Sequence, residues 1–357
     1  MSREVHKFGG ASVKDAAGVR NVASILAALV EWDIRPAVVV SAMGKTTNAL
    51  ERVWRGLPEA EQSHDIVGEV GRFHAQILED LGLKAAVLEE DWSAFVDTAD
   101  RLAGRTLSDA GYDALVGFGE RFSTRIVHAY LVSCGLEARW HSAWDLYKTD
   151  ASHRAAVVNL RDTGSNIRAA AAQSPGVMLT QGFVGGTDEG VPTTLGREGS
   201  DFSGALMAEA LDVRRFVVWK DVPGVMTGDP RRWPLAQPVR QLDYGTAERM
   251  SQAGAGILHP ATMAPLRRAG IALEVRSFLD PSAVGTEIAG DTPSDDIPNL
   301  WAFAKEEEKE IVRCLTDDEA AMREEWQRAF PDVSMGLIAV DPEIAGCLRM
   351  VCSAAPA

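Results

Sequence analysis

Two stretches near the N-terminus decide the fold: Val-His-Lys-Phe-Gly-Gly at residues 5–10 and Ala-Val-Val-Val at residues 37–40. The first predicts a short strand that two glycines end. The second is a continuous apolar run between turn residues, which is typical of a strand buried on both faces of a parallel sheet. Between the two, apolar residues recur at helical spacing: Val19, Val22, Leu26 and Leu29. A strand, a helix and a strand in this order predict an α/β layer fold.

The rest of the N-terminal half continues this pattern. We expect Ser12 and Asp15 to form a capping box at the start of the first helix, with Ser12 accepting from the first turn. Residues from about 50 to 136 follow a mostly helical pattern that breaks near residues 104–111. Strands are then expected at 177–181, 215–219 and 272–277, and helices at 200–211, 244–253 and 262–269. The sequence therefore predicts a central, mostly parallel sheet between helix layers.

A Pro- and Asp-rich stretch at residues 291–298 reads as a linker. It predicts a large domain at residues 1–290, a linker at 291–300 and a small α+β domain at 301–357. In this last part we expect strands at 310–315, 333–340 and 348–353, with a helix at 317–330.

Composition limits the function classes. The chain has 357 residues, 46% of them hydrophobic, and 36 Lys+Arg against 51 Asp+Glu give a net charge of −15. This is an ordinary globular composition, and its acidity argues against a nucleic-acid-binding role, which needs a basic face. We expect no membrane span or signal peptide, because no apolar stretch is long enough. The four cysteines form no CxxC pair and the seven histidines are scattered, which favours a cytoplasmic protein without a zinc cluster.

Two familiar phosphate-binding motifs are incomplete. Gly44, Lys45 and Thr46 follow a strand, but Val39 stands where a P-loop requires its first glycine. Likewise, the glycines at 117 and 119 are followed by Phe122, where the Rossmann pattern requires a third glycine. The sequence therefore predicts neither a P-loop NTPase nor a Rossmann dinucleotide-binding site.

Glycine-dense segments at residues 7–10, 182–187 and 193–201 are more informative as a set. Each lies at the C-terminal end of a predicted strand or at the start of a helix, where α/β proteins bind ligands and anions. Each one alone is also compatible with a tight turn that needs glycine. Their recurrence, twice with a Lys or Arg, favours anion binding.

These segments carry a resemblance to a known family. The matching stretches occur in the family's order: KFGGASV (7–13), VVSAMGKTTNAL (39–50), GFGERFST (117–124), TQGFVGGT (180–187), TTLGREGSD (193–201), WKDVPGVMTGDPR (219–231), GILHPATMAPL (256–266) and VRSFLDPSAVGTEI (275–288). Together they resemble the aspartate kinases (aspartokinases) of the amino-acid kinase family. The variants found here look most like the short monofunctional type of the Bacteroidetes, with a reduced C-terminal regulatory region.

The resemblance implies that ATP and Mg²⁺ are used to phosphorylate the side-chain carboxylate of L-aspartate. The product is 4-phospho-L-aspartate, and the reaction opens lysine, threonine and methionine biosynthesis. The step needs no general base, because a carboxylate with a pKa near about 3.9 is already ionised at neutral pH. The site must instead supply positioning and positive charge. By the same resemblance we expect a homodimer.

The resemblance also assigns site residues. Its catalytic residues are Lys7 and Asp201. Its residues for the amino-acid substrate are Ser41, Thr47, Glu120, Arg197 and Ser200, with Arg197 clamping the α-carboxylate and Glu120 receiving the α-ammonium. Its nucleotide residues are Lys7, Gly9, Gly10, Lys220, Asp221, Met226 and Arg231. Metal ligands stay unassigned. As alternatives, Lys7 could be a solvated strand-end lysine, and Glu120 a helix-surface acid with Arg121 and Arg125 as partners. Trp219 is expected to pack in the core rather than stack on a base.

Some positions depart from the family pattern. Gly256 replaces a lysine that reaches the ATP phosphates in many relatives, and Lys220 stands where threonine is common. We hypothesise that Lys220 restores the missing positive charge. Met226, Glu198 and the run Phe202-Ser203-Gly204 also differ, which leaves two alternatives: a kinase for another small amino acid or carboxylate, or a catalytically silent regulatory relative. The resemblance implies regulatory ACT modules after the kinase domain, and the short region after residue 288 fits either part of one ACT-like module or a simple cap without a ligand. We therefore expect weak or absent feedback inhibition by lysine or threonine.

Overall fold

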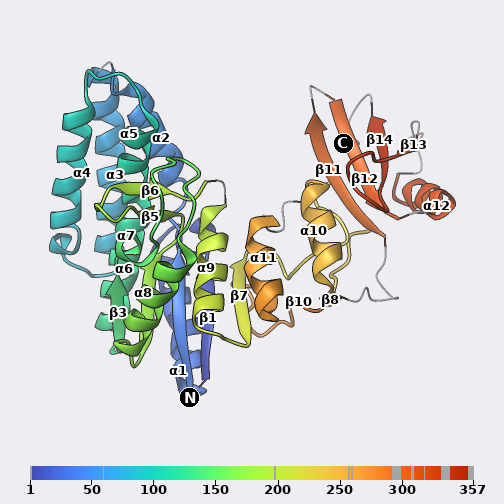
Figure 1. Ribbon diagram of the computed structural model, residues 1–357, viewed down its shortest axis with the longest axis horizontal. Helices are drawn as coiled ribbons and strands as arrows, with labels where there is room; N and C mark the ends of the chain where they lie inside the picture. Colours follow the sequence, from blue (N-terminus) through green and yellow to red (C-terminus); the bar gives the residue numbers. More distant parts are fainter. Residues whose placement is uncertain are drawn as a thin grey trace. The chain divides into compact units, whose positions relative to one another are not determined.

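The structure is a computed structural model that describes residues 2–58, 60–196, 198–255, 258, 260–291, 299–306, 309–316, 318–330 and 338–352. The chain divides into two compact units, Met1–Asp221 and Val222–Ala357 (Figure 1). Each unit is described by itself.

A parallel sheet forms the centre of the first unit. Its strands are β1 (Ser2–Phe8), β2 (Ile34–Val40), β3 (Ala138–His141), β4 (Val177–Gln181) and β7 (Arg215–Lys220). They follow the order β3-β4-β2-β1-β7, and every pairing among these five strands is parallel. All of β4 and the apolar run of β2 are buried, as expected for strands covered on both faces.

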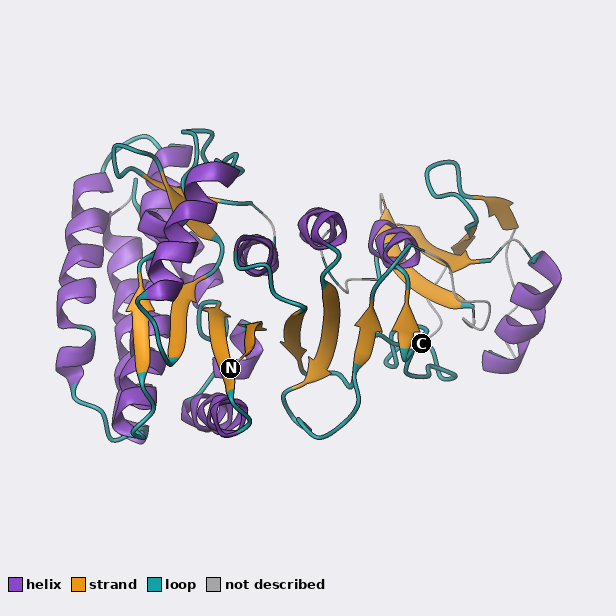
Figure 2. Cartoon of the chain, turned by 60° about the horizontal axis from the view of Figure 1, so that its bottom comes forward, coloured by secondary structure: helices purple, strands orange, loops and turns teal. Residues whose placement is uncertain are grey.

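Helices cover this sheet (Figure 2). They are α1 (Ala16–Glu31), α2 (Thr46–Gly56), α3 (Ala60–Asp80), α4 (Glu89–Leu102), α5 (Asp109–Val116), α6 (Phe118–Ser133), α7 (Ala143–Leu146), α8 (Leu160–Ala172) and α9 (Gly199–Ala210). The break predicted near residues 104–111 is confirmed, since α4 ends at Leu102 and α5 begins at Asp109. Short 3₁₀ turns at Gly10–Val13 and Ala85–Val87 and a hairpin of β5 (Val184–Gly186) and β6 (Pro192–Thr194) complete the unit.

The capping prediction for α1 was wrong in one respect. The N-cap is Asp15, whose carboxylate accepts from the Gly18 backbone N–H at 2.8 Å. Ser12 lies one turn earlier, in the 3₁₀ turn that follows Gly9, and it is buried. The glycine pair inserts this extra turn between strand and helix, so the acceptor falls three residues later than the sequence pattern indicates.

The second unit begins with three strands and two helices. β8 (Gln241–Leu242) pairs in parallel with β10 (Thr286–Ile288), which pairs antiparallel with β9 (Ala272–Ser277). The helices are α10 (Tyr244–Gln252) and α11 (Pro260–Ala269). An antiparallel sheet of order β11-β12-β14-β13 follows, with β11 (Leu300–Glu306), β12 (Lys309–Leu315), β13 (Ile338–Val340) and β14 (Leu348–Cys352). Helix α12 (Glu319–Ala329) connects β12 to the second pair of strands.

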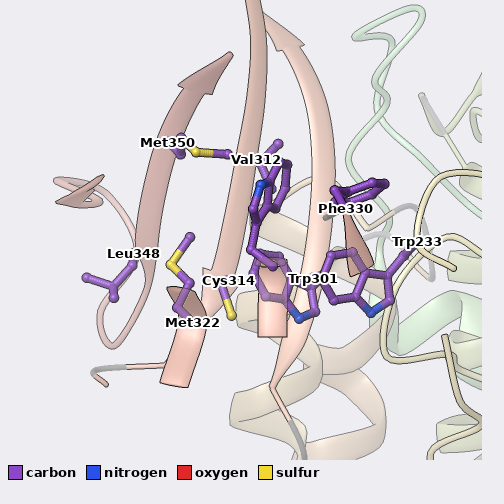
Figure 3. Close-up of a cluster of buried hydrophobic side chains, with 9 residues drawn as sticks. Trp233, Trp301, Val312, Cys314, Met322, Phe330, Leu348 and Met350 are labelled. Atoms are coloured by element: carbon purple, nitrogen blue, oxygen red, sulfur yellow. The ribbon is translucent and has the colours of Figure 1, made fainter. Parts of the chain in front are cut away.

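Aromatic residues form the core of this antiparallel sheet (Figure 3). The rings of Trp233 and Trp301 stack with centroids 4.2 Å apart, and Trp326 and Phe330 of the α12 region pack against Trp233. Strand β11, which carries Trp301, was not predicted. The linker predicted at 291–298 and the first part of the strand predicted at 333–340 lie almost wholly outside the described residues. Among the helices described, none is both long and apolar enough to cross a membrane.

Candidate active site

An ion pair lies at the C-terminal end of the parallel sheet. Lys7 belongs to β1, which β2 and β7 flank, and Asp201 belongs to the first turn of α9. The Lys7 Nζ lies 2.6 Å from Asp201 Oδ1, and the two side chains are only 12% and 5% exposed. Lys7 is therefore held by a buried carboxylate and is not a solvated strand-end lysine.

Close approach of two loops explains the glycines after β1. The Ser41 N–H donates to the Phe8 carbonyl and the Gly44 N–H to the Gly10 carbonyl, each at 3.0 Å. A Cβ on Gly10 would lie 2.6 Å from the Ala42 carbonyl oxygen, so no other residue fits without displacing the loop. Gly9 lies beside the Lys7 ammonium, since a Cβ there would be 3.6 Å from Nζ.

A cleft of about 540 Å³ opens within the first unit. Its lining includes predicted site residues from separate parts of the chain: Gly10, Ser41, Thr47, Glu120 and Ser200. They come from the loop after β1, the loop after β2, and the first turns of α2, α6 and α9. Helix N-termini and strand ends thus face a common space, which favours anionic ligands.

Glu120 is a buried acid in this cleft. It is 3% exposed, and its Oε1 accepts from the Ala42 N–H at 3.2 Å, while no described residue donates to its Oε2. Burial raises the pKa of Glu120 to about 8, although the Ala42 N–H and the charge of Lys7 act in the opposite direction. The surface-acid alternative is wrong, because Arg121 and Arg125 both pair with Asp91 instead.

A second lysine lies near the ion pair. Lys220 ends β7, next to β1. Burial lowers its pKa, the charge of Asp201 opposes that shift, and the charge of Lys7 adds to it. Two ammonium groups thus act on one carboxylate. Asp221, the next residue, is exposed and also favours the charged form of Lys220.

The remaining predicted residues are placed as follows. Met226 and Arg231 belong to the second unit, where Met226 is half-buried and the exposed Arg231 binds Asp229 through hydrogen bonds of 3.0 and 2.8 Å. Arg197 and Gly256 lie outside the described residues. Trp219 packs as expected: it is buried and stacks on Phe8 with centroids 5.7 Å apart.

Sequence reasoning missed part of the cleft wall. Glu51, Tyr112 and Arg154 also line the cleft. The Tyr112 hydroxyl donates to Glu51 Oε1 at 2.7 Å. None of the three belongs to a recognised glycine-rich segment. The one backbone signal, a left-handed conformation at Arg154, is visible only in the structure.

The fold is that of an α/β protein whose polar cleft, glycine turn and lysine–aspartate pair lie at the carboxyl ends of parallel strands. Open α/β sheets bind their ligands at this edge. A model described as the amino acid kinase family matches residues 2–277, and the chain belongs to that family. This confirms the resemblance drawn from the motifs.

The relatives found by comparison agree. The chain is 34% identical to lysine-sensitive aspartokinase 3 of Escherichia coli, over 84% of this chain and 67% of the relative. It is 33% identical to the chloroplastic aspartokinase 2 of Arabidopsis thaliana, over 80% of this chain and 54% of the relative. The chain thus spans about half the length of the curated Arabidopsis relatives that it matches.

A solved structure confirms the fold class. The crystal structure of E. coli aspartokinase III in complex with aspartate and ADP superposes with a TM-score of 0.78 at 28% identity. The match covers 98% of this chain and 78% of the other.

Proposed function

We propose that this chain transfers the γ-phosphoryl group of ATP to the side-chain carboxylate of L-aspartate. The observation that carries the proposal is the buried Lys7–Asp201 pair at the glycine turn, in the same unit as a cleft that holds a buried acid, Glu120. It is supported by relatives named aspartokinases and by the solved structure with aspartate and ADP.

The acceptor would bind through complementary charges. An α-ammonium placed at Glu120 would give its Oε2 a donor and would lower the raised pKa of this carboxyl, because an opposite charge favours the ionised form. Hydroxyls of Ser41, Thr47 and Ser200 line the same cleft and can donate to carboxylate oxygens. Arg197, by resemblance, would hold the α-carboxylate through two parallel hydrogen bonds.

The transfer itself is balanced without a proton. An oxygen of the aspartate carboxylate forms a bond to the γ-phosphorus, the bond from that phosphorus to the bridging oxygen breaks, and ADP leaves. Negative charge on the phosphoryl oxygens needs cations that are already in place. Lys7 would supply one, oriented by Asp201, and Lys220 would supply a second.

The remaining assignments are proposals of the same kind. We place the nucleotide on Gly9, Gly10, Lys220, Asp221, Met226 and Arg231. The described residues contain no cluster of three acidic, cysteine or histidine side chains for a metal. This fits Mg²⁺, which is usually held by substrate phosphates and one or two carboxylates. Asp201 is the buried carboxylate suited to it. The ion would neutralise phosphate charge. A homodimer and a cytosolic location stay predictions.

Trapping with hydroxylamine tests the function directly. The full chain is incubated with ATP, Mg²⁺, hydroxylamine and single amino acids, and the acyl phosphate is captured as a hydroxamate. We expect a signal with L-aspartate and not with glutamate or asparagine. A signal with a different acceptor would replace aspartate in the proposal. No signal with any acceptor, in protein that still binds ATP, would point to a silent binding relative.

A further inference from the structure

Arg154 has an unusual backbone in the wall of the cleft. Its φ of 67° is left-handed, a conformation that L-residues other than glycine rarely adopt. Such strain persists where the surroundings enforce it and is concentrated at functional sites. The Arg154 backbone therefore needs contacts that enforce it, separate from the contacts that its side chain makes.

A buried carboxylate holds the backbone of Arg154. The Arg154 N–H donates to both oxygens of Asp113, at 3.2 and 3.0 Å, and the side chain of Asp113 is fully buried. Thr194 and His153 contact the same carboxylate, at 2.6 and 2.9 Å. The backbone is thus fixed by contacts that do not involve the guanidinium of Arg154.

The guanidinium itself is loosely held. Its Cζ lies 4.3 Å from the ring centroid of Tyr112, and its terminal nitrogen lies 3.4 Å from Asp109 Oδ1. The side chain is 47% exposed, and Asp109 is more exposed still. Exposed pairs of this kind contribute little to stability. Among the described residues, only Asp109 accepts from this guanidinium, so most of its N–H groups can donate to a ligand.

Arg154 contributes a positive charge to a cleft whose other charged lining residues, among those described, are acidic. Among the described lining residues, Glu51, Glu120 and Glu198 are acidic, and Arg154 is the one cation. The same segment lies close to the loop after β6, since a Cβ on Gly196 would be 3.2 Å from the Arg154 carbonyl oxygen. The Ala156 N–H also donates to the Thr194 carbonyl, at 2.9 Å.

We propose that Arg154 binds the α-carboxylate of the acceptor amino acid, in addition to the Arg197 that the resemblance assigns to this group. This inference rests on the proposed function. With the reacting carboxylate at Lys7 and the ammonium at Glu120, the α-carboxylate is the one charged group of the acceptor without a described partner. Arginine suits it because its planar fork forms two parallel hydrogen bonds to a carboxylate.

Substitution combined with a changed substrate tests the contact. Arg154→Gln should raise the KM for L-aspartate about 10- to 100-fold, as expected for a charge-assisted hydrogen bond, and leave the KM for ATP unchanged. With the α-amide of aspartic acid as acceptor, the same substitution should change kcat/KM less than about threefold, because the partner charge is gone. Equal losses with both acceptors would overturn the proposal.

Two variants separate binding from folding. Arg154→Gly suits the left-handed backbone, so it should keep or raise the melting temperature and still lose aspartate affinity as Arg154→Gln does. An Arg154→Gly enzyme with unchanged aspartate kinetics would show that the arginine is dispensable. Arg52→Gln is the matched control: it removes another exposed arginine with an ion pair of 3.4 Å, outside the cleft, and should change nothing. A wild type that does not phosphorylate aspartate would overturn the proposed function and this inference with it, whereas an active wild type with unchanged Arg154 variants would overturn the inference alone.

Discussion

The two units each contain a buried ion pair, and the pairs are built differently. In the second unit, Asp341 accepts from the Arg313 Nε at 2.8 Å and from the backbone N–H groups of Glu343 and Ile344 at 2.9 and 3.1 Å. In the first unit, Asp201 faces the ammonium of Lys7 at 2.6 Å, and the charge of Lys220 acts on the same region.

The donors around the two carboxylates distinguish a pair suited to stabilising the fold from a pair suited to binding a ligand. Fixed donors saturate Asp341: burial alone would raise its pKa, but the hydrogen bonds from Arg313 and Glu343 outweigh burial and lower it. Around Asp201 the cations are the ammonium groups of Lys7, in contact with it, and of Lys220, whose charge interacts with it, and both lie on flexible stems. Such cations can turn toward phosphate oxygens, which the fixed donors around Asp341 cannot do.

Breaking the first pair should give the largest effect. Lys7→Ala removes a cation that would stabilise the transferring phosphoryl group, so kcat should fall about 10³- to 10⁵-fold, as when cations are removed from other phosphoryl-transfer sites. Asp201→Asn should lower kcat through misplacement of Lys7. Hydroxamate assays measure both, with circular dichroism to confirm folding. A Lys7→Ala enzyme with near-normal kcat would show that the pair is structural after all.

Breaking the second pair should affect stability instead. Asp341→Asn removes the carboxylate charge that lies 2.8 Å from the buried Arg313, and breaking such a buried pair typically costs about 3–5 kcal/mol of the free energy of unfolding. Replacing both residues, in Arg313→Met with Asp341→Leu, should cost much less, because no charge is left unpaired. Urea unfolding measures both. At permissive temperature, kcat per folded molecule should be unchanged, and a specific loss of kcat would contradict the structural role.

The resemblance assigned both residues of the first pair to one site, and nothing in the sequence indicated the second pair. Lys7 and Asp201 lie in glycine-rich segments, where local pattern predicts strand ends and a helix start. Arg313 and Asp341 come from β12 and from the turn after β13, and only the antiparallel sheet brings them together. Arg154 was not predicted as a site residue for the same reason, because the Asp113 that binds its backbone lies 41 residues away in the sequence.

Errors in the fold prediction have local causes. The apolar run of β11, Leu300–Ala304, lacks the alternation that indicates a half-buried strand, and it follows directly on a Pro-rich stretch. Pairing with β12 and the stacking of Trp301 on Trp233 determine the strand instead. The parallel strands β2, β4 and β7 were predicted because each contains an apolar run that is visible without knowledge of its partners, whereas β3, with the sequence Ala-Arg-Trp-His, contains none and was not predicted.

Glu120 is the intermediate case, a buried carboxylate without a cation in contact. Its pKa is raised to about 8, so an ammonium substrate must bind the minor ionised form below that pH. We expect kcat/KM for aspartate to rise about tenfold per pH unit up to about pH 8. In Glu120→Gln the profile should be flat over this range. A wild-type profile that is already flat from pH 6 would show that Glu120 does not receive the ammonium.

The same shift has a stability counterpart in the unliganded protein. A carboxyl group with a raised pKa contributes stability that is fully present below its unfolded value near 4.5 and is lost as pH rises through about 8. Glu120→Gln removes this dependence. The melting temperature of Glu120→Gln minus that of the wild type should therefore increase as pH rises from 5 to 8. A difference that stays constant over this range would contradict the raised pKa of Glu120.

Lys220 should give the smallest effect, because it shares its role with Lys7. Burial lowers the pKa of Lys220, which means that burial disfavours its charged form. Bound phosphate would favour the charged form again. Lys220→Ala should raise the KM for ATP about tenfold, a typical loss for one charge-assisted contact, with little change in the KM for aspartate. Lys220→Arg keeps the charge and should retain most of the affinity. Unchanged ATP kinetics in Lys220→Ala would remove Lys220 from the phosphate site.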